Sequence, residues 1–222
     1  MQLQVSQSRT QFVCSREEQV DIRKEFDGRH RLLLRDFLEP RLLDDVRRRI
    51  DGAEANEVTH EVGHEIELKD ERAKALLEFL VNDPVLCDAI SALTGCGSIG
   101  CFSGRIYEMR SGSNHEFRWH TDLSNDRLIA MSINLGSEPY CGGVLQIAEA
   151  STKRLLDTVP NIGSGDAVIF RIAPTLMHRV IPVEGSTPKV AYAGWFCSRP
   201  SYHDVLGERS RTVAQLVHQS NA

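Results

Sequence analysis

The sequence predicts an α+β, mainly β protein: a sandwich or jelly roll of about eight strands, supported by helices from the N-terminal part of the chain. Three observations lead to this prediction. Helix-like runs dominate residues 1–97, β-rich runs separated by turn signals fill residues 98–198, and no repeat or linker interrupts the chain. We therefore expect a single domain over residues 1–222, in which residues 199–222 form a C-terminal tail or helix.

The helices are predicted from their periodic apolar residues and from the residues at their ends. Each begins at a residue that can cap a helix, or at a proline that fits its first turn. The predicted starts are Ser15 with Glu18 as a capping box, Pro40, Asp70, and Asp83 with Pro84. Gly28 is expected to end the first helix and Gly95 the last, because glycine readily adopts the left-handed conformation. Between the first two helices, RLLL at 31–34 predicts a short strand.

The second part of the chain is predicted as strands. Short runs rich in β-branched and aromatic residues recur there between turn signals such as GG and GSGD. In order, these runs are GRIYEM, EFRWHTD, LIAMSINL, VLQIAEA, DAVIFRI, MHRVIPV and KVAYAGWF. Strands at such regular spacing are typical of a sandwich or jelly roll.

The charge and the cysteines limit the possible functions. The chain is 41% hydrophobic and has a formal net charge of −5, which argues against general binding of nucleic acid or of an anionic membrane surface. Its six cysteines form no C-x-x-C pair. The N-terminus lacks the apolar core of a signal peptide, and no apolar run is long enough to span a bilayer. We therefore expect a cytoplasmic protein with reduced thiols.

The stretch THEVGHEIEL at 59–68 contains H-E-x-x-H, a pattern of zinc metalloproteases. That pattern requires a helix, on which His60 and His64 bind one zinc and Glu61 acts as the base. Apolar and polar residues instead alternate here, which predicts one strand over residues 57–68 with both histidines on its apolar face. Their Cα atoms would then lie about 13 Å apart, too far for one zinc. This strand either lines a substrate cleft or lies at a sheet edge.

A second motif, RWHTD at 118–122, has the spacing of a metal-binding pair. On a strand, His120 and Asp122 point to the same face, about 6.6 Å apart along the chain. His178, in the later run TLMHRV, can supply a third ligand. Two imidazoles and one carboxylate form the facial triad of non-haem Fe(II) oxygenases, which leaves coordination positions open. H-x-D alone is common by chance, so its weight depends on the residues that follow.

Lys189, in KVAYAGWF, comes eleven residues after His178. With this series the chain resembles the prolyl-hydroxylase-like branch of the Fe(II)/2-oxoglutarate-dependent dioxygenase superfamily, whose pattern is H-x-D, a distal His, a basic residue and a strand with a Trp. The resemblance covers roughly residues 30–198 and includes FLEP, the segment from Tyr107 to Gly112, and the GG-x-L turn at 142–145. It implies a double-stranded β-helix with the iron at one mouth.

The resemblance also implies cofactors and their ligands. Fe(II) would be the metal, and 2-oxoglutarate and O2 the co-substrates. The implied iron ligands are His120, Asp122 and His178. Lys189 would pair with the far carboxylate of 2-oxoglutarate, with Asn134 as a polar partner of the same carboxylate and Tyr107 near its C1 end.

The implied function is a dioxygenase that hydroxylates an unactivated C–H bond of a small molecule, amino acid or peptidyl residue and releases succinate and CO2. Related halogenases carry a small residue at the position of Asp122, so its presence favours hydroxylation. Two other classes stay open: a non-catalytic metal- or ligand-binding barrel of the cupin type, and a zinc hydrolase that uses HEVGH. We expect a small-molecule or peptide substrate, and neither nucleic acid nor a membrane as a partner.

Two further features are candidates for substrate binding. Residues 53–70 are a candidate lid, because substrate-binding loops vary most in this fold. Arg171, in IFRIA, is a candidate for binding a substrate carboxylate, and a salt bridge is the alternative.

Overall fold

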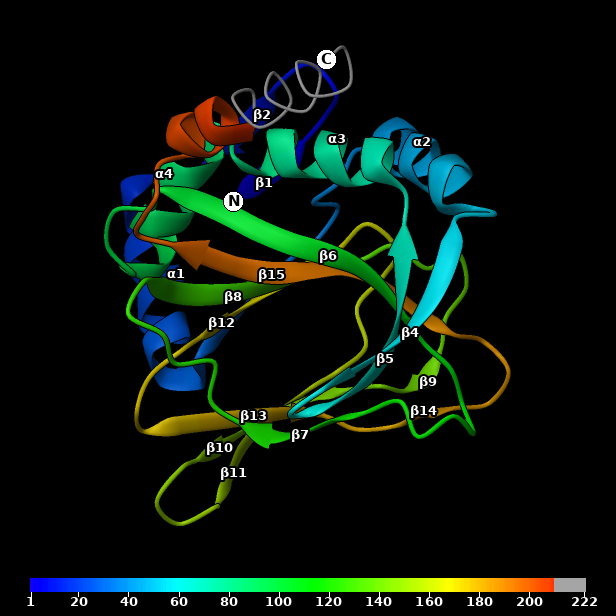
Figure 1. Ribbon diagram of the computed structural model, residues 1–222. Coiled ribbons are helices and arrows are strands. Elements are labelled where there is room, and N and C mark those ends of the chain that lie inside the picture. Colours follow the sequence, from blue (N-terminus) through cyan, green and yellow to red (C-terminus); the bar gives the residue numbers. More distant parts are fainter. Residues whose placement is uncertain (210–222) are drawn as a thin grey trace.

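The computed structural model describes residues 1–209 and contains one large rolled sheet with helices around its upper half (Figure 1). Within these residues the sheet has eleven strands. Its upper half consists of β6 (Cys101–Met109), β15 (Lys189–Cys197), β8 (Arg127–Asn134), β12 (Ala167–Arg171) and β3 (Arg31–Leu34). Its lower half consists of β7 (Phe117–His120), β13 (Leu176–Val180), β10 (Leu145–Glu149) and β11 (Leu155–Val159). The pairs are antiparallel, and the predicted jelly-roll fold is confirmed.

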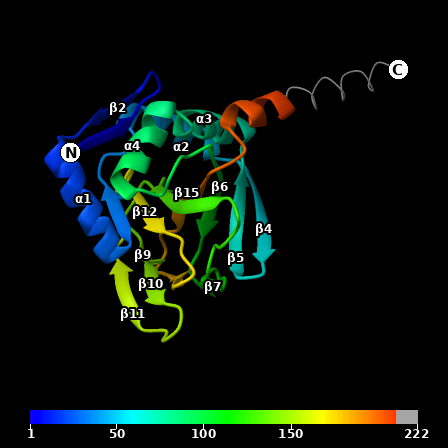
Figure 2. The same cartoon turned by 90° about the vertical axis from the view of Figure 1, so that its left-hand side faces the viewer.

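Four labelled helices cover the outer face of the upper half and its edge (Figure 2). They are α1 (Arg16–Arg29), α2 (Pro40–Ile50), α3 (Glu71–Val81) and α4 (Pro84–Thr94). The predicted capping box of Ser15 with Glu18 is present, Asp70 accepts a hydrogen bond from the backbone N–H of Ala73, and Gly95 ends α4 in the left-handed conformation. The predicted end of α1 at Gly28 is wrong. The helix continues to Arg29, because His30 takes the left-handed cap position and donates its N–H to Phe26.

The main core lies between these helices and the outer face of the upper half. On β6 and β15, the even-numbered residues Phe102, Ile106, Tyr192 and Phe196 are all buried against it. Each fully buried side chain of this size contributes about 1.5–3 kcal/mol. Residues 202–209 form a further helix, whose Arg209 makes a bidentate ion pair with Glu78 of α3. The rest of the predicted C-terminal tail lies outside the described residues.

Residues 1–97 contain more β structure than the sequence predicts. β1 (Gln2–Val5) and β2 (Thr10–Val13) form a hairpin at the N-terminus, with Leu3 and Val5 buried. The strand predicted at 31–34 is present as β3. The mainly helical interpretation of residues 1–97 is wrong in part, because the hairpin β1–β2 was not predicted and the segment described next contains two strands instead of one. A small pair, β9 (Cys141–Gly142) with β14 (Val183–Glu184), was also not predicted.

The predicted single strand over residues 57–68 is wrong. The segment is a hairpin of β4 (Glu54–His60) and β5 (Gly63–Lys69), joined by Glu61 and Val62. Because the turn reverses the chain, Val58 lies opposite Glu65, and Thr59 lies opposite His64. Residues directly opposite each other share a face of the sheet. His60 and His64 therefore point to opposite faces.

The hairpin β4–β5 joins the two halves of the sheet on the right of Figure 1. β5 pairs with β6 at Ile66 and Glu67, and with β7 at Gly63. A Cβ atom on Gly63 would lie 2.0 Å from the carbonyl oxygen of Glu116, so only glycine allows this approach. The predicted lid at residues 53–70 is therefore wrong, because the strands within it are paired parts of the sheet and form a wall.

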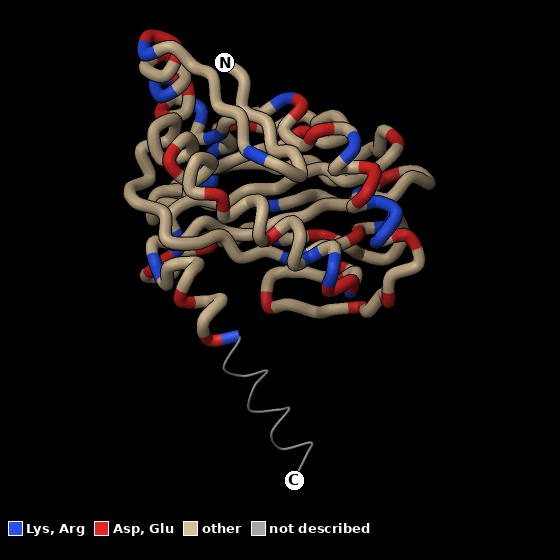
Figure 3. Tube along the Cα trace, turned by 90° about the horizontal axis from the view of Figure 1, so that it is seen from above, with Lys and Arg blue, Asp and Glu red and all other residues tan. Residues whose placement is uncertain are grey.

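Positions of both charge signs are interspersed along the described trace (Figure 3). The formal net charge of −5 is thus spread rather than gathered into one block. Among the helices of residues 1–209, none has the length and apolar character that crossing a bilayer requires.

Candidate metal centre and its cavity

A cavity of about 530 Å³ lies between the two halves of the sheet. Its lining includes five of the six predicted site residues, namely Tyr107, His120, Asp122, His178 and Lys189. The structure thus brings together residues that are up to 82 positions apart in the sequence, counted from Tyr107 to Lys189 (189 − 107). A volume of this size falls in the usual range for small-molecule sites.

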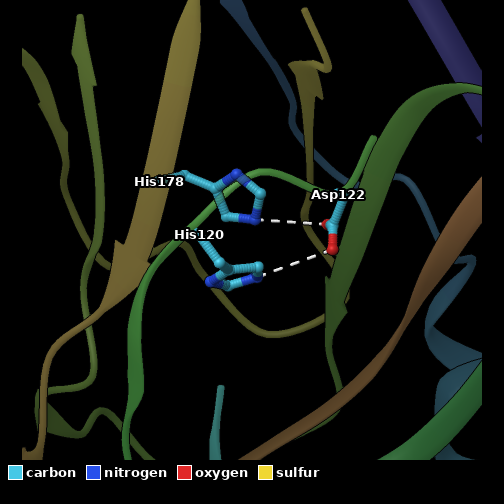
Figure 4. Close-up of side chains that lie close together, drawn as sticks. All are labelled: His120, Asp122 and His178. Carbon is cyan, nitrogen blue, oxygen red and sulfur yellow. Dashed lines mark ion pairs between the residues drawn. The ribbon is translucent and has the colours of Figure 1, made fainter. Parts of the chain in front are cut away.

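The two histidines and Asp122 meet at the lower side of this cavity (Figure 4). His120 on β7 and His178 on β13 are directly paired across the strands. The Nε2 atom of His120 lies 3.5 Å from Oδ1 of Asp122, and that of His178 lies 3.2 Å from Oδ2. Each of the three residues offers one potential ligand atom within 4.8 Å of those of the other two. One detail of the prediction is wrong, because β7 ends at His120 and Asp122 lies in the following loop.

Two hydrogen bonds fix the orientation of these groups. The Nδ1 atom of His120 lies 2.6 Å from the backbone carbonyl oxygen of Arg118. A carbonyl only accepts hydrogen bonds, so Nδ1 carries a proton, and Nε2 faces Asp122 as the atom that a metal ion would bind. On the opposite side, the indole N–H of Trp195 donates to Oδ2 of Asp122 at 2.7 Å.

The surroundings of Asp122 favour its ionised form. Burial alone would raise its pKa, but hydrogen bonds from His120, His178 and Trp195 outweigh burial and hold the pKa well below its usual range. Burial lowers the pKa of His178. At His120 burial also acts to lower the pKa, but the interactions with Asp122 and the Arg118 carbonyl outweigh it and raise the pKa. A carboxylate that is ionised in this way is ready to bind a metal ion.

Lys189 lies at the inner end of the cavity, and its side chain is almost fully buried, with an exposure of 8%. Its ammonium group donates to the carbonyl oxygen of Gly143 at 2.7 Å and lies 5.9 Å from the ring centre of Tyr140. No carboxylate of residues 1–209 forms an ion pair with it, and burial lowers its pKa to about 8. A buried cation without an acidic partner fits an anionic ligand at this end of the cavity.

The other two predicted co-substrate residues differ in what they can offer. Asn134 lies beside Lys189 in a smaller adjoining cavity, but its amide group donates to the carbonyls of Ile162 and Gly163 and accepts from the N–H of Gly136. Because both of its donors are used within the chain, we do not assign it to a ligand. Tyr107 lines the main cavity, and burial raises the pKa of its phenol, so it keeps its proton and can donate it in a hydrogen bond.

Several cavity residues were missed by the sequence analysis. They are Arg105, Arg127 and Trp195. His60 also lines the cavity, as the cleft alternative for its strand predicted. Arg105 lies two positions before Tyr107 on β6, so period-2 alternation places both side chains on one face, a signal that the sequence contains. Arg171, in contrast, points away from the cavity. It pairs with Asp27 of α1, so the salt-bridge alternative is the one that the structure contains.

The two histidines of the HEVGH motif do not form a metal site. His60 hydrogen-bonds to the buried Glu65, with 2.9 Å between Nε2 and Oε1, whereas His64 is exposed on the other face beside Thr59. Among residues 1–209, the group His120, Asp122 and His178 is the one cluster of three side chains with metal-binding geometry.

Comparison with known sequences supports the same chemistry. Residues 104–197 match the sequence model of the 2OG-Fe(II) oxygenase superfamily, which spans both histidines, Asp122 and Lys189. The match covers 94 of the 222 residues, and this part of the chain is similar to that superfamily. Together with the His120, Asp122 and His178 group, this match indicates a 2OG-Fe(II)-dependent oxygenase, an enzyme that uses Fe(II), 2-oxoglutarate and O2. No curated protein matches its sequence.

Solved structures share the oxygenase fold at low sequence identity. A prolyl-4-hydroxylase from Pseudomonas putida is 21% identical, with a TM-score of 0.60 over 82% of this chain and 100% of that one. A prolyl hydroxylase from Trichoplax adhaerens, solved with a peptide fragment of the hypoxia inducible factor oxygen degradation domain, is 15% identical, with a TM-score of 0.62 over 81% and 89%. The nogalamycin-biosynthesis epimerase SnoN is 12% identical, with a TM-score of 0.62 over 82% and 84%.

Proposed function

We propose that this oxygenase hydroxylates an unactivated C–H bond of a small molecule, an amino acid or a peptidyl residue. In the overall reaction, substrate, 2-oxoglutarate and O2 give the alcohol, succinate and CO2. One oxygen atom enters the new hydroxyl group and the other enters succinate. The observation that carries this proposal is the cavity itself, which has two imidazoles and a carboxylate on one side and an unpaired buried ammonium group at its inner end.

We assign His120, Asp122 and His178 as the ligands of Fe(II). Two neutral imidazoles and a carboxylate are the donor set expected for such iron, and their common distance of 4.8 Å or less suits one ion. Bound there, Fe(II) would supply the activation of O2 and the oxidation of the substrate. The hydrogen bonds from Trp195 and to the Arg118 carbonyl then hold the ligands in place.

Lys189 is assigned to the far carboxylate of 2-oxoglutarate. An ammonium group in a buried slot forms a charge-assisted hydrogen bond to a carboxylate, and the walls of the slot keep water from competing. Tyr107 lies on the neighbouring strand, directly paired with Ala191 of β15. Its phenol can therefore donate a hydrogen bond to the co-substrate from the same wall of the cavity.

Fe(II) and 2-oxoglutarate titrations under nitrogen test this proposal, followed by release of succinate in air with candidate substrates. We expect one Fe(II) per chain and a saturable response to 2-oxoglutarate. His120→Ala, Asp122→Ala and His178→Ala should each lose iron or turnover. A chain that binds metal but shows no 2-oxoglutarate-dependent succinate release would instead be a cupin-like binding barrel.

The substrate screen should include both free small molecules and peptides. The Trichoplax adhaerens enzyme was solved with a peptide fragment, which supports the inclusion of peptidyl substrates. Stimulation of succinate release by a screened compound, together with the mass of one added oxygen atom in that compound, identifies hydroxylation. A product of unchanged mass, or a product that has lost two hydrogens, would exclude it.

A further inference from the structure

The outer part of the cavity contains two arginines around one tryptophan. Arg105 on β6, Trp195 on β15 and Arg127 on β8 belong to three adjacent strands of the upper half, and all three line the cavity. The guanidinium carbon of Arg127 lies 3.6 Å from the centre of the Trp195 ring, and that of Arg105 lies 5.9 Å from the same centre. Trp195 also donates to Asp122, so this cluster adjoins the candidate metal centre.

The charge of Arg105 is already neutralised. Glu65, whose side chain is 0% exposed, accepts hydrogen bonds from Nε and Nη2 of Arg105 in a bidentate pair. His60 approaches the same carboxylate from the hairpin β4–β5. A bidentate pair of this kind fixes the plane of the guanidinium group, so Arg105 serves as a rigid part of the wall.

Arg127 has no comparable partner among residues 1–209. Its nearest acidic group is Oδ1 of Asp122, 3.6 Å from Nη1, and the same nitrogen lies 3.4 Å from the backbone oxygen of Asp122. Both distances exceed the roughly 2.7–2.9 Å of a close charge-assisted hydrogen bond. Arg127 therefore presents guanidinium N–H groups to the cavity that no carboxylate in the described chain satisfies.

Arg127 is the cation of the cavity lining that stays without a close acidic partner when the other charged groups are paired. On the proposed function, the two positive charges of Fe(II) and that of Lys189 face the charge of Asp122 and the two charges of 2-oxoglutarate, so this set is neutral. Arg105 and Glu65 cancel each other. Glu61 also lines the cavity, but among residues 1–209 it forms no ion pair with Arg127. Arg127 is therefore a partly buried cation without a close acidic partner, and an anionic ligand is favoured beside it.

We propose that Arg127, stacked on Trp195, binds a carboxylate group of the substrate and so selects substrates with one negative charge near the reacting carbon. This inference rests on the proposed function for its charge count. The lining also contains apolar side chains, among them Val62, Phe117, Phe170 and Val180. The cavity therefore suits a carboxylate carried on an apolar body, either as a free acid or as a side chain of a peptide.

Binding of phenylacetate and of its neutral counterpart phenylacetamide tests this inference. The chain has two tryptophans, and Trp119 lies outside the cavity lining. In Trp119→Phe protein, the fluorescence of Trp195 therefore reports binding next to Arg127. The two compounds are titrated under nitrogen with Fe(II) and 2-oxoglutarate present, which prevents turnover, and again in their absence. An end-capped peptide with one internal aspartate and its asparagine counterpart are titrated in parallel.

We expect each acid to bind about tenfold or more tightly than its amide. Arg127→Gln should reduce the affinity for the acid roughly tenfold to a hundredfold and leave that for the amide unchanged. A lower dissociation constant for phenylacetate than for the aspartyl peptide points to a free acid, and the reverse order points to a peptidyl carboxylate.

Matched controls make the result decisive. Arg199→Gln removes an exposed arginine that pairs with Asp126 outside the cavity lining, and it should leave all affinities unchanged. Unaltered Fe(II) and 2-oxoglutarate binding by Arg127→Gln shows that this variant is folded. Equal binding of acids and amides, or no saturable response to either with or without the cofactors, would overturn the inference. Failure of Fe(II) or 2-oxoglutarate to bind would instead contradict the proposed function, and the cofactor-free titrations would still test Arg127.

Discussion

The inner and outer ends of the cavity differ in how their cations are held. At the inner end, Lys189 is buried, and its ammonium group has a backbone carbonyl but no carboxylate as a described partner. At the outer end, Arg105 is locked to Glu65, while Arg127 lies half-exposed on a tryptophan. The inner end thus offers a buried ammonium group, and the outer end combines a paired arginine with one that has no close carboxylate partner.

On the proposed function, this difference separates the binding of the co-substrate from the binding of the substrate. A buried, unpaired cation is costly in the free protein, so its presence indicates a ligand that binds in every catalytic cycle. A partly exposed arginine costs less, because water satisfies its donors when the site is empty. The predictions below test the two ends separately.

Removal of the inner cation should have the largest effect. Lys189→Ala is expected to weaken 2-oxoglutarate binding by a factor of hundreds or more, because loss of one partner of a buried charge pair costs about 3–5 kcal/mol. Fe(II) affinity should stay nearly constant. Calorimetric titration of both ligands measures this, and Lys189→Arg should recover part of the binding. Unchanged 2-oxoglutarate affinity in Lys189→Ala would show that another residue binds the far carboxylate of 2-oxoglutarate.

Removal of the outer wall's carboxylate should affect stability rather than co-substrate binding. Glu65→Ala leaves Arg105 unpaired beside the cavity, which should lower the free energy of unfolding by about 3 kcal/mol in urea denaturation. The exposed Glu54 on the same hairpin provides the control, and Glu54→Ala should change stability by less than about 0.5 kcal/mol. Similar losses of unfolding free energy in the two variants would show that the Glu65–Arg105 pair does not stabilise the protein.

The inner end should also respond to pH. Because the pKa of Lys189 is lowered to about 8 in the free protein, 2-oxoglutarate affinity should be constant below pH 8 and fall up to tenfold per pH unit above it. The phenols that face this end, Tyr107 and Tyr140, have raised pKa values and stay neutral in this range. In Lys189→Arg the fall should disappear, because the guanidinium group stays charged. A wild-type affinity that is flat to pH 10 would contradict the assignment.

The smallest effects are expected from the two histidines of HEVGH. His60→Leu removes one partner of Glu65 and should cost about 1 kcal/mol of stability, whereas His64→Leu changes an exposed residue and should have almost no effect. Both variants should keep full Fe(II) stoichiometry. Loss of iron in either one would show that the hairpin contributes to the metal site.

The features that were predicted correctly are those whose sequence signals are local. The caps of α3 and α4 depend on residues a few positions apart, and they were predicted correctly. The H-x-D motif is equally local, and a distal histidine and a lysine at suitable spacing made the candidate site recognisable. The fold followed from the regular spacing of strands, which is also visible along the chain.

The hairpin β4–β5 shows why other features escaped. Its turn at Glu61 and Val62 contains no glycine or asparagine, and neither residue has a positive φ, so the usual signal of a two-residue hairpin loop is missing. The alternation of apolar and polar residues continues through the turn without a break. It therefore predicts Glu65 on the polar face, away from the two histidines. Its true surroundings depend on Arg105, 40 residues further along the chain.

β5 also determines which parts of the sheet are expected to unfold together. The backbone N–H of His64 bonds to Glu116, and that of Arg118 bonds to Val62, while further along β5 pairs with β6 of the upper half. Neither half of the roll can separate from the other unless this strand is released. In hydrogen exchange, the amides that join β5 to its two neighbours are therefore expected to exchange together, at the rate of the slowest core amides. The cavity wall and the core would then unfold as one cooperative unit, and the amides of the wall would exchange only when the whole sheet unfolds.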